Sequence, residues 1–453
     1  PAPTPSTAPA GSSAVAVAMP TPAAPTAPAP AAASGGSVSI SAPSITVAES
    51  GNIKATGSAQ GGNVTLNSGS TGTTTVAGRI DVSAAAATVD DTPPAPAIGG
   101  NADILGNTVA LTGSAKIDAS GDQGGGTVNI GGGWQGAKVA DGTTATATSI
   151  ASGATVDASA KVNGKGGTIA VWSDVQNPLS ITRVAGTLTA RGGAQAGDGG
   201  SIETSGHRLD INGITVNAAA AKGKAGNWLL DPYDITITAA PTPTSPPSGV
   251  TLSPTSAPTY TSSTTGAVIY NTTIQDALNA GTSVTIQTGT SGNDTTCGAC
   301  AGDITVTSNT GIAKTAGTDA ALTLSAHRDI VFGGGSSIIS TAGKLDINLF
   351  SNTSGSGGAI VFNSDSTPGS GASTTVSLQS NGGAITLAGG ADGTGYATGS
   401  ANGYVFGADT HQDGLSLSNV TLDSRVYASG AVQTTGGGDI MLRGKGYAGD
   451  LVQ

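Results

Sequence analysis

Charged and aromatic residues are scarce in this sequence of 453 residues. Charged residues make up 10% of the chain and aromatic residues 3%, and glutamate occurs only at Glu49 and Glu203. Typical globular proteins carry roughly 25% charged residues. Because Glu, Lys, Arg and Met favour helices, their scarcity excludes a mainly helical protein. Bulky side chains are also too few for a wide core, so we expect a narrow core filled by Val, Ile, Leu, Ala and Thr.

Basic clusters and long apolar runs are absent as well. The chain has 17 basic and 28 acidic residues, which gives a formal net charge of −11. Phosphate groups are bound through basic side chains, so this balance argues against nucleic acid and against an anionic membrane surface as partners. No apolar run approaches the roughly 18 residues of a membrane-spanning helix.

Glycine pairs followed by alternating apolar residues are the most informative feature of the first half. They open segments such as GGNVTL and GGTVNI, and the second glycines, at positions 36, 62, 100, 126, 167 and 200, are 26 to 41 residues apart. A turn that needs glycine, followed by a strand of period two and repeated at this spacing, is typical of a stacked β-coil array. The pairs are Gly35-Gly36, Gly61-Gly62, Gly99-Gly100, Gly125-Gly126, Gly166-Gly167 and Gly199-Gly200, and Gly226 opens a single-glycine variant.

Composition divides the chain into four segments. Residues 1–34 are rich in Pro and Ala, with nine prolines, and predict an extended tail. Residues 35–239 form a first repeat block with three short strands and three turns per coil. Residues 240–271 are a linker rich in Pro, Thr and Ser. Residues 272–453 comprise a short helix and then a second block of alternating strands. We expect about seven coils in each block, from the roughly 26-residue spacing of such repeats.

One helix is predicted, over residues 272–281 (TTIQDALNAG). Thr272 and Gln275 have the spacing of a capping box, and Gly281 provides the stop signal. Units longer than 26 residues carry insertions at 90–96 and 135–149. These two loops are where a regular rod would acquire a specific surface.

The sequence therefore predicts an all-β protein, a right-handed parallel β-helix (solenoid) in two blocks with a Pro-rich tail and linker. The ends of such a rod are open strand edges that need a cap or a partner. We hypothesise that the tail, residues 1–34, docks along another surface such as a neighbouring copy of the protein.

Residues able to carry chemistry are few. Cys297 and Cys300 have the Cys-x-x-Cys spacing but lie in a Gly/Asp/Thr loop, so we favour a small local disulfide over a reactive dithiol. The three histidines are far apart and predict turn or surface positions rather than ligands or bases. The turn GGAQAGDGG lacks the regular repeat of calcium-binding nonapeptides. We expect no catalytic residue, no metal site and no cofactor.

Two carboxylates, Asp231 and Asp234, flank a Pro-Tyr turn in LLDPYDI. A pair of carboxylates invites a glycosidase interpretation. The structural interpretation is preferred, because Asp-Pro favours a turn and aspartates cap exposed backbone amides.

The stretch from 166 to 238 resembles the filamentous-haemagglutinin-type exoproteins, the secreted partners of two-partner secretion systems. Its most specific pieces are VWSD at 171–174, GGSIETSG at 199–206 and AGNWLLDPYDITI at 225–237. The signature residues, which the family uses structurally, are Trp172, Gly199, Gly200, Trp228, Leu229, Leu230, Asp231, Pro232 and Asp234.

The resemblance implies a parallel β-helix, export through an outer-membrane transporter, and a role in adhesion or surface structure. Family members begin with a signal peptide and a secretion domain carrying Asn-Pro-x-Gly-type motifs, and neither is present here. The chain is thus similar to the middle or distal β-helical region of such a protein.

The expected function is that of a non-enzymatic protein, secreted or at the bacterial cell surface. It would be an adhesin or the structural subunit of an extracellular filament, with a homo-oligomer or filament as its assembly and host or surface glycans as further partners. The alternatives are a β-helical polysaccharide lyase or hydrolase, and a carbohydrate-binding module that uses loop 90–96 or 135–149. Scarce basic and aromatic residues argue against the enzyme.

Overall fold

A computed structural model describes residues 33–446, apart from 87–95, 141, 242–266, 290–301, 363–374, 399–403, 407–408, 412, 429–430 and 433–435. The chain divides into two units, and all described residues belong to the second, Ala32–Gln453. The predicted tail and most of the predicted linker lie outside the described residues, as does nearly all of loop 90–96. The hypothesis that the tail docks on another surface is therefore a matter for experiment.

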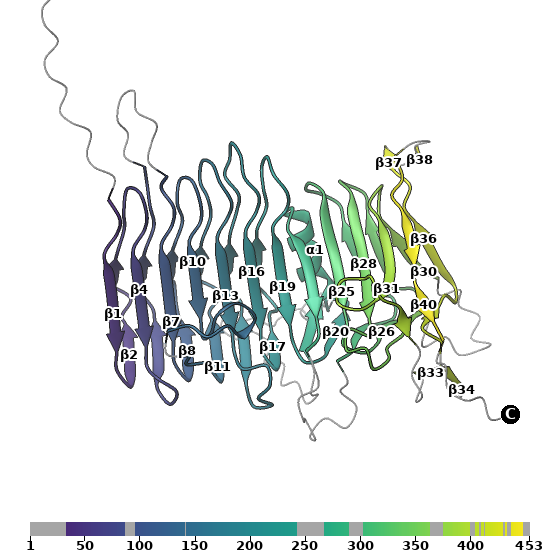
Figure 1. Cartoon of the computed structure of the whole chain (residues 1–453), viewed down its shortest axis with the longest axis horizontal. Helices are drawn as coiled ribbons and strands as arrows, with labels where there is room; N and C mark the ends of the chain where they lie inside the picture. The colour runs from purple at the N-terminus through teal and green to yellow at the C-terminus, as the bar shows by residue number, and fades with distance from the viewer. Residues whose placement is uncertain are drawn as a thin grey trace, which may run out of the picture. The chain divides into compact units, whose positions relative to one another are not determined.

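The described chain is a parallel β-helix, as the sequence predicts (Figure 1). One strand of each coil belongs to a single twelve-stranded parallel sheet, here called the long sheet, which runs through both predicted blocks. Its strands, in spatial order, are β1 (Ser37–Ser41), β4 (Asn63–Asn67), β7 (Asn101–Leu105), β10 (Thr127–Ile130), β13 (Thr168–Trp172), β16 (Ser201–Ser205), β19 (Asn227–Asp231), β22 (Ser283–Gln287), β25 (Ala320–Ser325), β28 (Leu345–Ser351), β31 (Ile385–Gly389) and β39 (Ile440–Leu442).

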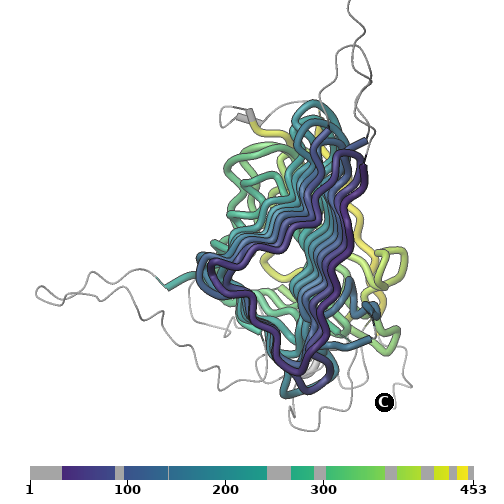
Figure 2. The backbone as a smooth tube through the Cα atoms, turned by 90° about the vertical axis from the view of Figure 1, so that its left-hand side faces the viewer, coloured from purple at the N-terminus to yellow at the C-terminus, as the bar shows by residue number. Residues whose placement is uncertain are grey.

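Two six-stranded sheets complete the coils of the first block. The second sheet contains β2 (Ser44–Val47), β5 (Thr73–Val76), β8 (Thr108–Leu111), β11 (Ala147–Ile150), β14 (Ile181–Val184) and β17 (Arg208–Asp210). The third contains β3 (Asn52–Lys54), β6 (Arg79–Asp81), β9 (Lys116–Asp118), β12 (Thr155–Asp157), β15 (Thr187–Thr189) and β18 (Thr215–Asn217). Figure 2 shows these coils lying over one another.

The second block uses different flanking sheets. The fourth sheet contains β21 (Ala267–Tyr270), β20 (Ile235–Thr238), β23 (Ile304–Val306), β26 (Ile330–Phe332), β29 (Ile360–Phe362) and β35 (Leu415–Ser416). The fifth contains β24 (Gly311–Lys314), β27 (Ser337–Ser340), β30 (Val376–Gln379) and β36 (Val420–Asp423). Short two-stranded pairs are β32 (Ala397–Thr398) with β40 (Gly444–Lys445), β33 (Tyr404–Phe406) with β34 (Asp409–His411), and β37 (Tyr427–Ala428) with β38 (Ala431–Val432).

Each predicted glycine pair directly precedes a strand of the long sheet, which confirms the repeat. The reason for glycine differs from the expected one, because none of these pairs has a positive φ. At Gly125, a Cβ atom would lie 1.8 Å from the carbonyl oxygen of Ala158 in the next coil. Neighbouring coils approach too closely at this corner for any side chain.

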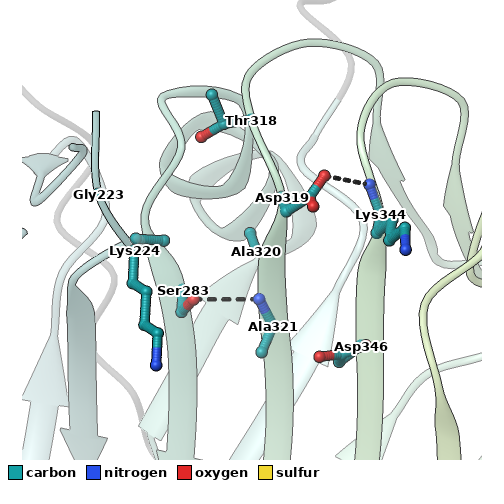
Figure 3. A pocket seen from close by; sticks show the side chains of 10 residues that line it. Gly223, Lys224, Ser283, Thr318, Asp319, Ala320, Ala321, Lys344 and Asp346 are labelled. Carbon is teal, nitrogen blue, oxygen red and sulfur yellow. Dashed lines mark hydrogen bonds between the residues drawn. The ribbon is translucent and has the colours of Figure 1, made fainter. Parts of the chain in front are cut away.

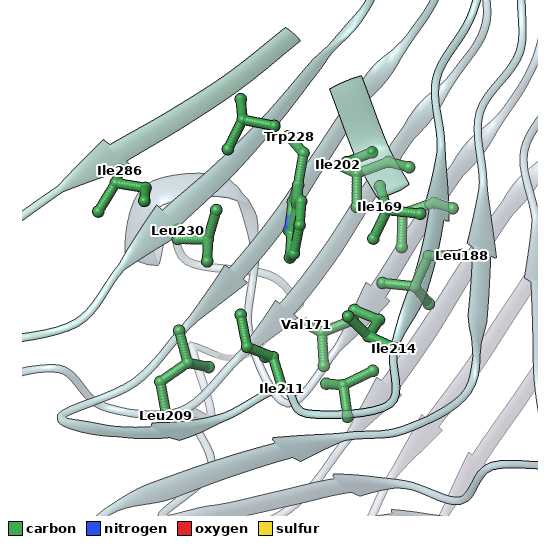
Figure 4. Close-up of a cluster of buried hydrophobic side chains, with 14 of the residues drawn as sticks. Ile169, Val171, Leu188, Ile202, Leu209, Ile211, Ile214, Trp228, Leu230 and Ile286 are labelled. Carbon is green, nitrogen blue, oxygen red and sulfur yellow. The ribbon is translucent and has the colours of Figure 1, made fainter. Parts of the chain in front are cut away.

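The long sheet keeps one register from end to end. Inward side chains stack in columns, so that Val38 lies over Val64 at one end and Ile385 lies over Ile440 at the other. Near the middle, Trp228 and its neighbours close the narrow core between the sheets (Figure 4). Phe332 and Phe362 stack on adjacent coils with ring centroids 5.1 Å apart. The few aromatic residues thus extend columns that aliphatic side chains fill elsewhere.

The junction between the blocks contains helix α1 (Asn271–Asn279). It contacts β18 and β24, and so stands where a flanking strand would lie in other coils. The predicted stop at Gly281 is confirmed: its φ is +81°, and Gly281 and Thr282 donate to the carbonyls of Leu278 and Ala277. This is the hydrogen-bond pattern of a Schellman motif.

The predicted capping box of α1 is wrong. The N-cap is Tyr270, and no side chain caps the helix. Instead, Gln275 accepts a hydrogen bond from the backbone N–H of Ala313 in β24, at 2.9 Å. A strand of the next coil offers an unpaired amide there, and this tertiary contact overrides the local sequence signal.

The second block has fewer coils than predicted. The long sheet has seven strands in the first block, as expected, but five in the second. The segment around Tyr404, predicted as a coil strand, pairs antiparallel with β34 in a short hairpin. Twelve strands spaced by about 4.8 Å give the long sheet a length of roughly 53 Å.

Candidate functional site

The signature residues lie on or beside three neighbouring strands of the long sheet, and Pro232 and Asp234 follow the last of them. Trp172, Ser205 and Asp231 occupy one row across β13, β16 and β19. Gly199 and Gly200 precede β16, and residues 228–231 belong to β19. The sequence motif therefore corresponds to one patch of the solenoid, since strands more than 20 residues apart become neighbours.

Trp228 explains the inward side of this patch. Its side chain is fully buried, and its Nε1 donates a hydrogen bond of 3.0 Å to Oγ1 of Thr204 on β16. Leu230 points into the same core (Figure 4). The indole fills the core width, and its polar N–H is satisfied by the hydroxyl of Thr204, which lies in the neighbouring inward column.

A loop covers the outward side of the patch. Residues 131–146, which include the 3-10 turn η1 (Trp134–Gly136), fold back over β13 and β16. A Cβ at Gly132 would lie 2.7 Å from the Trp172 ring, and a Cβ at Gly136 would lie 2.9 Å from it. The predicted insertion 135–149 is therefore shorter than expected, because β11 begins at Ala147, and it packs on the rod instead of projecting from it.

Glu203 fastens this loop to the sheet. Its Oε2 accepts the backbone N–H of Gln135 at 2.6 Å, and its Oε1 accepts the hydroxyl of Ser205 at 2.7 Å. Gln135 has a φ of +49°, a conformation that costs energy for a residue with a side chain. Glu203 is 0% exposed, and burial raises the pKa of its carboxyl. Sequence analysis did not identify this residue, although it is one of only two glutamates in the chain.

Asp231 is a second acidic group nearby, in the same outward row as Ser205. Its Oδ1 atom is buried and has no hydrogen-bond partner within the described chain. Burial, with a smaller contribution from the charge of Glu203, raises the pKa of Asp231 to about 7. The expectation that Asp231 caps a backbone amide is wrong for this oxygen. Glu203 is fully buried, so its carboxyl is out of reach of a substrate.

Asp234 does act as a backbone cap. Its Oδ1 accepts the N–H of Asp303 at 2.7 Å, Asp303 accepts the N–H of Asp329 at 3.0 Å, and Asp329 accepts the N–H of Ala359 at 2.7 Å. Arg328 lies beside this ladder and forms ion pairs with Asp303 and Asp329. Burial, then the charge of Asp303, raises the pKa of Asp329 to about 6. The sequence signal was an Asp directly before Ile at the start of three strands, which sequence analysis did not use.

Histidine and lysine occupy buried positions that the sequence did not predict. His207 lies in the bend between β16 and β17, a turn position as predicted, but it is buried and stacks on Tyr233 with ring centroids 5.0 Å apart. Its Nδ1 lies 3.0 Å from the carbonyl oxygen of Val175. Lys314 is also buried, and its ammonium donates to the carbonyls of Ala316 and Ala342. These groups are satisfied by turn carbonyls and aromatic contacts, as structural polar residues are.

A groove on the rod surface collects four charged side chains (Figure 3). It has a volume of about 600 Å³ and is lined by Lys224, Asp319, Lys344 and Asp346, among others. The aspartates accept backbone N–H groups of Lys344 and Ala384, at 2.9 and 2.8 Å. Neither lysine ammonium has an ion-pair partner in the described part of the chain. Such a groove could hold a polar or acidic ligand.

Cys297 and Cys300 lie outside the described residues, so the disulfide stays a prediction. In the described part of the chain, no three His, Cys, Asp or Glu side chains are grouped so that they could hold a metal ion. Asp198, in the turn compared with calcium-binding repeats, accepts the N–H of Lys224 at 2.7 Å. No helix in the described ranges is long and apolar enough to cross a membrane. No protein-family model matches the chain, and no curated protein matches it.

Proposed function

We propose that this chain is a non-enzymatic protein, secreted or at the bacterial surface, of filamentous-haemagglutinin type. It serves as an adhesin or as the structural subunit of an extracellular filament. The observation that supports this proposal is the unbroken twelve-stranded long sheet. A sheet that extends through the described chain makes a rod, and a rod displays loops at a distance or builds a fibre.

The proposed mechanism is mechanical. From β1 to β18 each coil is joined to the next by three parallel strand pairings, and bending the rod there would strain many hydrogen bonds at once. The side-chain ladders at the coil corners add directional contacts; Arg79, for example, bridges Asp81 and Asp118 on successive coils at 3.0 Å each. Export would use an outer-membrane transporter. The net charge of −11 argues against nucleic acid as a partner.

The test is antibody labelling of intact bacteria that express the chain within its natural precursor and with its transporter. We expect label on rods or filaments at the outer surface and in the medium. Label confined to the cell interior would overturn the proposal. A strain lacking the transporter is the control, since it should lose the surface label without losing the protein.

A second candidate function is binding or cleavage of a polysaccharide. The groove of Lys224, Asp319, Lys344 and Asp346 favours binding, because free ammonium groups can pair with acidic sugars. Isothermal titration with acidic and neutral oligosaccharides would test it. The double variant Lys224→Ala/Lys344→Ala should abolish binding if the groove is the site, whereas Lys54→Ala/Lys116→Ala, on coils away from the groove, should not. Release of reducing ends from a polysaccharide would favour the enzyme.

A further inference from the structure

The two end strands of the long sheet each have a free edge in the part of the chain that the structure describes. Strand β1 pairs only with β4, and β39 pairs only with β31. Each therefore presents a row of unpaired backbone N–H and C=O groups along one side. Free edges of this kind are templates for another strand.

Both ends also expose the last members of the core columns. Ile40 is 38% exposed and Leu442 is 43% exposed, whereas Leu66 and Leu387, one coil further in, are 0% exposed. Ile440 is 44% exposed. These positions belong to continuous columns: following the pairings strand by strand, Val38 and Ile440 are the two ends of one, and Ile40 and Leu442 are the ends of the next. At each end of the sheet, therefore, the two columns stop at side chains that a further strand in the same register would cover.

We propose that copies of this chain stack head to tail, with β39 of one copy pairing in parallel with β1 of the next in the register of the long sheet. The proposal deepens the filament function and rests on it. In this arrangement Ile440 covers Val38 and Leu442 covers Ile40, so both columns continue across the junction. A contact between two different surfaces that does not close on itself generates an open filament.

A junction between like ends would be poorer. A two-fold axis that brings two β1 strands together would make them antiparallel, whereas every pairing of the long sheet is parallel. The inward side chains of the two β1 strands would then run in opposite sequence order along the junction, so the columns would not continue from one copy to the next. Head-to-tail stacking keeps strand direction, register and side-chain alternation unchanged.

Residues 1–32 are a weaker candidate for the β1 edge. They contain nine prolines, and proline has no backbone N–H to donate to a strand ladder. A second copy, by contrast, offers the three-residue strand β39, with apolar residues at the two positions that need cover.

Disulfide trapping tests the register. Ser39 and Met441 are the two ends of one outward row, so in the proposed junction they would face each other on adjacent strands. Adjacent strands are about 4.8 Å apart, which lies within the Cα separation that a disulfide spans. The full chain would carry Ser39→Cys and Met441→Cys in a Cys297→Ser/Cys300→Ser background, and circular dichroism would confirm folding. Mild oxidation should give a ladder of covalent dimers, trimers and larger species on non-reducing gels.

The matched control is Thr323→Cys with Met441→Cys, because Thr323 lies in the same outward row but in mid-sheet. We expect at least tenfold fewer trimers from it. Dimers from either single-cysteine variant, in the yield of the double variant, would mean that like ends meet and would overturn the proposal. A double variant that folds but gives no ladder of covalent oligomers would also overturn the proposal. Assembly that disappears when residues 1–32 are removed would overturn it as well. If labelled rods are found on cells but the double variant gives no covalent ladder, the proposed function stands and only the head-to-tail junction is rejected.

Discussion

Single glycines and single carboxylates decide how closely the coils of this protein can stack. The column of second glycines, from Gly62 to Gly226, lets each coil corner lie directly on the next. The second glycine also donates its N–H to a carbonyl at the end of the preceding coil, for example Gly126 to Ala119 at 2.8 Å. Close approach, rather than a left-handed backbone, is why a side chain is excluded there.

Substitution of one corner glycine should therefore be costly. In Gly125→Ala, the new Cβ would lie 1.8 Å from the Ala158 carbonyl oxygen. We expect a loss of about 3 kcal/mol in the free energy of unfolding, at the upper end of overpacking effects. Gly36→Ala is the matched control, because its Cβ meets nothing within 4 Å. Urea denaturation followed by circular dichroism measures both, and equal midpoints for the two variants would contradict the explanation.

Asp231 should make stability depend on pH. Its pKa is about 7 in the folded protein and lies near 3.9 in an unfolded chain. The folded state therefore holds this proton more tightly, and the resulting stabilisation is complete below about pH 4 and is lost as the pH rises to about 7. Asp231→Asn removes the effect. The free energy of unfolding of the variant, relative to that of the unsubstituted protein, should rise by about 2 to 4 kcal/mol between pH 4 and pH 8.

The control for this titration is Asp276→Asn, which changes an exposed carboxyl on α1. A pH-dependent gain of the same size in this variant would show that the effect does not come from Asp231. A constant difference for Asp231→Asn would contradict the raised pKa of this carboxyl.

At the scale of elements, the loop 131–146 depends on one buried carboxylate. Glu203→Ala removes the acceptor for the Gln135 amide and leaves that strained residue without its anchor. We expect trypsin to cleave after the exposed Lys138 at least tenfold faster in the variant. Cleavage after Lys222, in an exposed turn of another coil, is the internal reference. Parallel acceleration at both sites would indicate general unfolding instead of loop release.

Sequence periodicity was sufficient to predict the strands of the first block. Alternation and glycine pairs placed all seven long-sheet strands from β1 to β19, because both signals repeat in each coil. The helix was placed to within a few residues, yet its capping box was wrong, because Gln275 is used by β24 of the next coil. Contacts between coils join residues more than 20 positions apart, and local patterns do not report them.

The same limit explains the site. Trp172 and Trp228 were singled out from the motif, but one faces the loop and the other the core, which follows only from the register of β13 and β19. Glu203 was missed because its partner Gln135 is 68 residues away. The hairpin of β33 and β34 was predicted as a coil strand, since its alternation is the same in either arrangement.

At the scale of the whole molecule, the account rests on the long sheet and its ends. Because the register is the same over all twelve strands, the first and last coils present matching columns, and the apolar residues exposed at both ends mark where the stack would continue.

A substitution at the C-terminal edge of the long sheet should block growth of the filament. Leu442→Lys places a charge at the junction. We expect this variant to remain monomeric in analytical ultracentrifugation under conditions in which the unsubstituted protein assembles.

The most direct measurement is cryo-electron microscopy of the purified full chain at increasing concentration. The account predicts straight filaments whose power spectrum has a layer line near 4.8 Å along the axis, the spacing of strands stacked across every junction. Isolated particles at all concentrations, together with release of reducing ends from a polysaccharide, would contradict it.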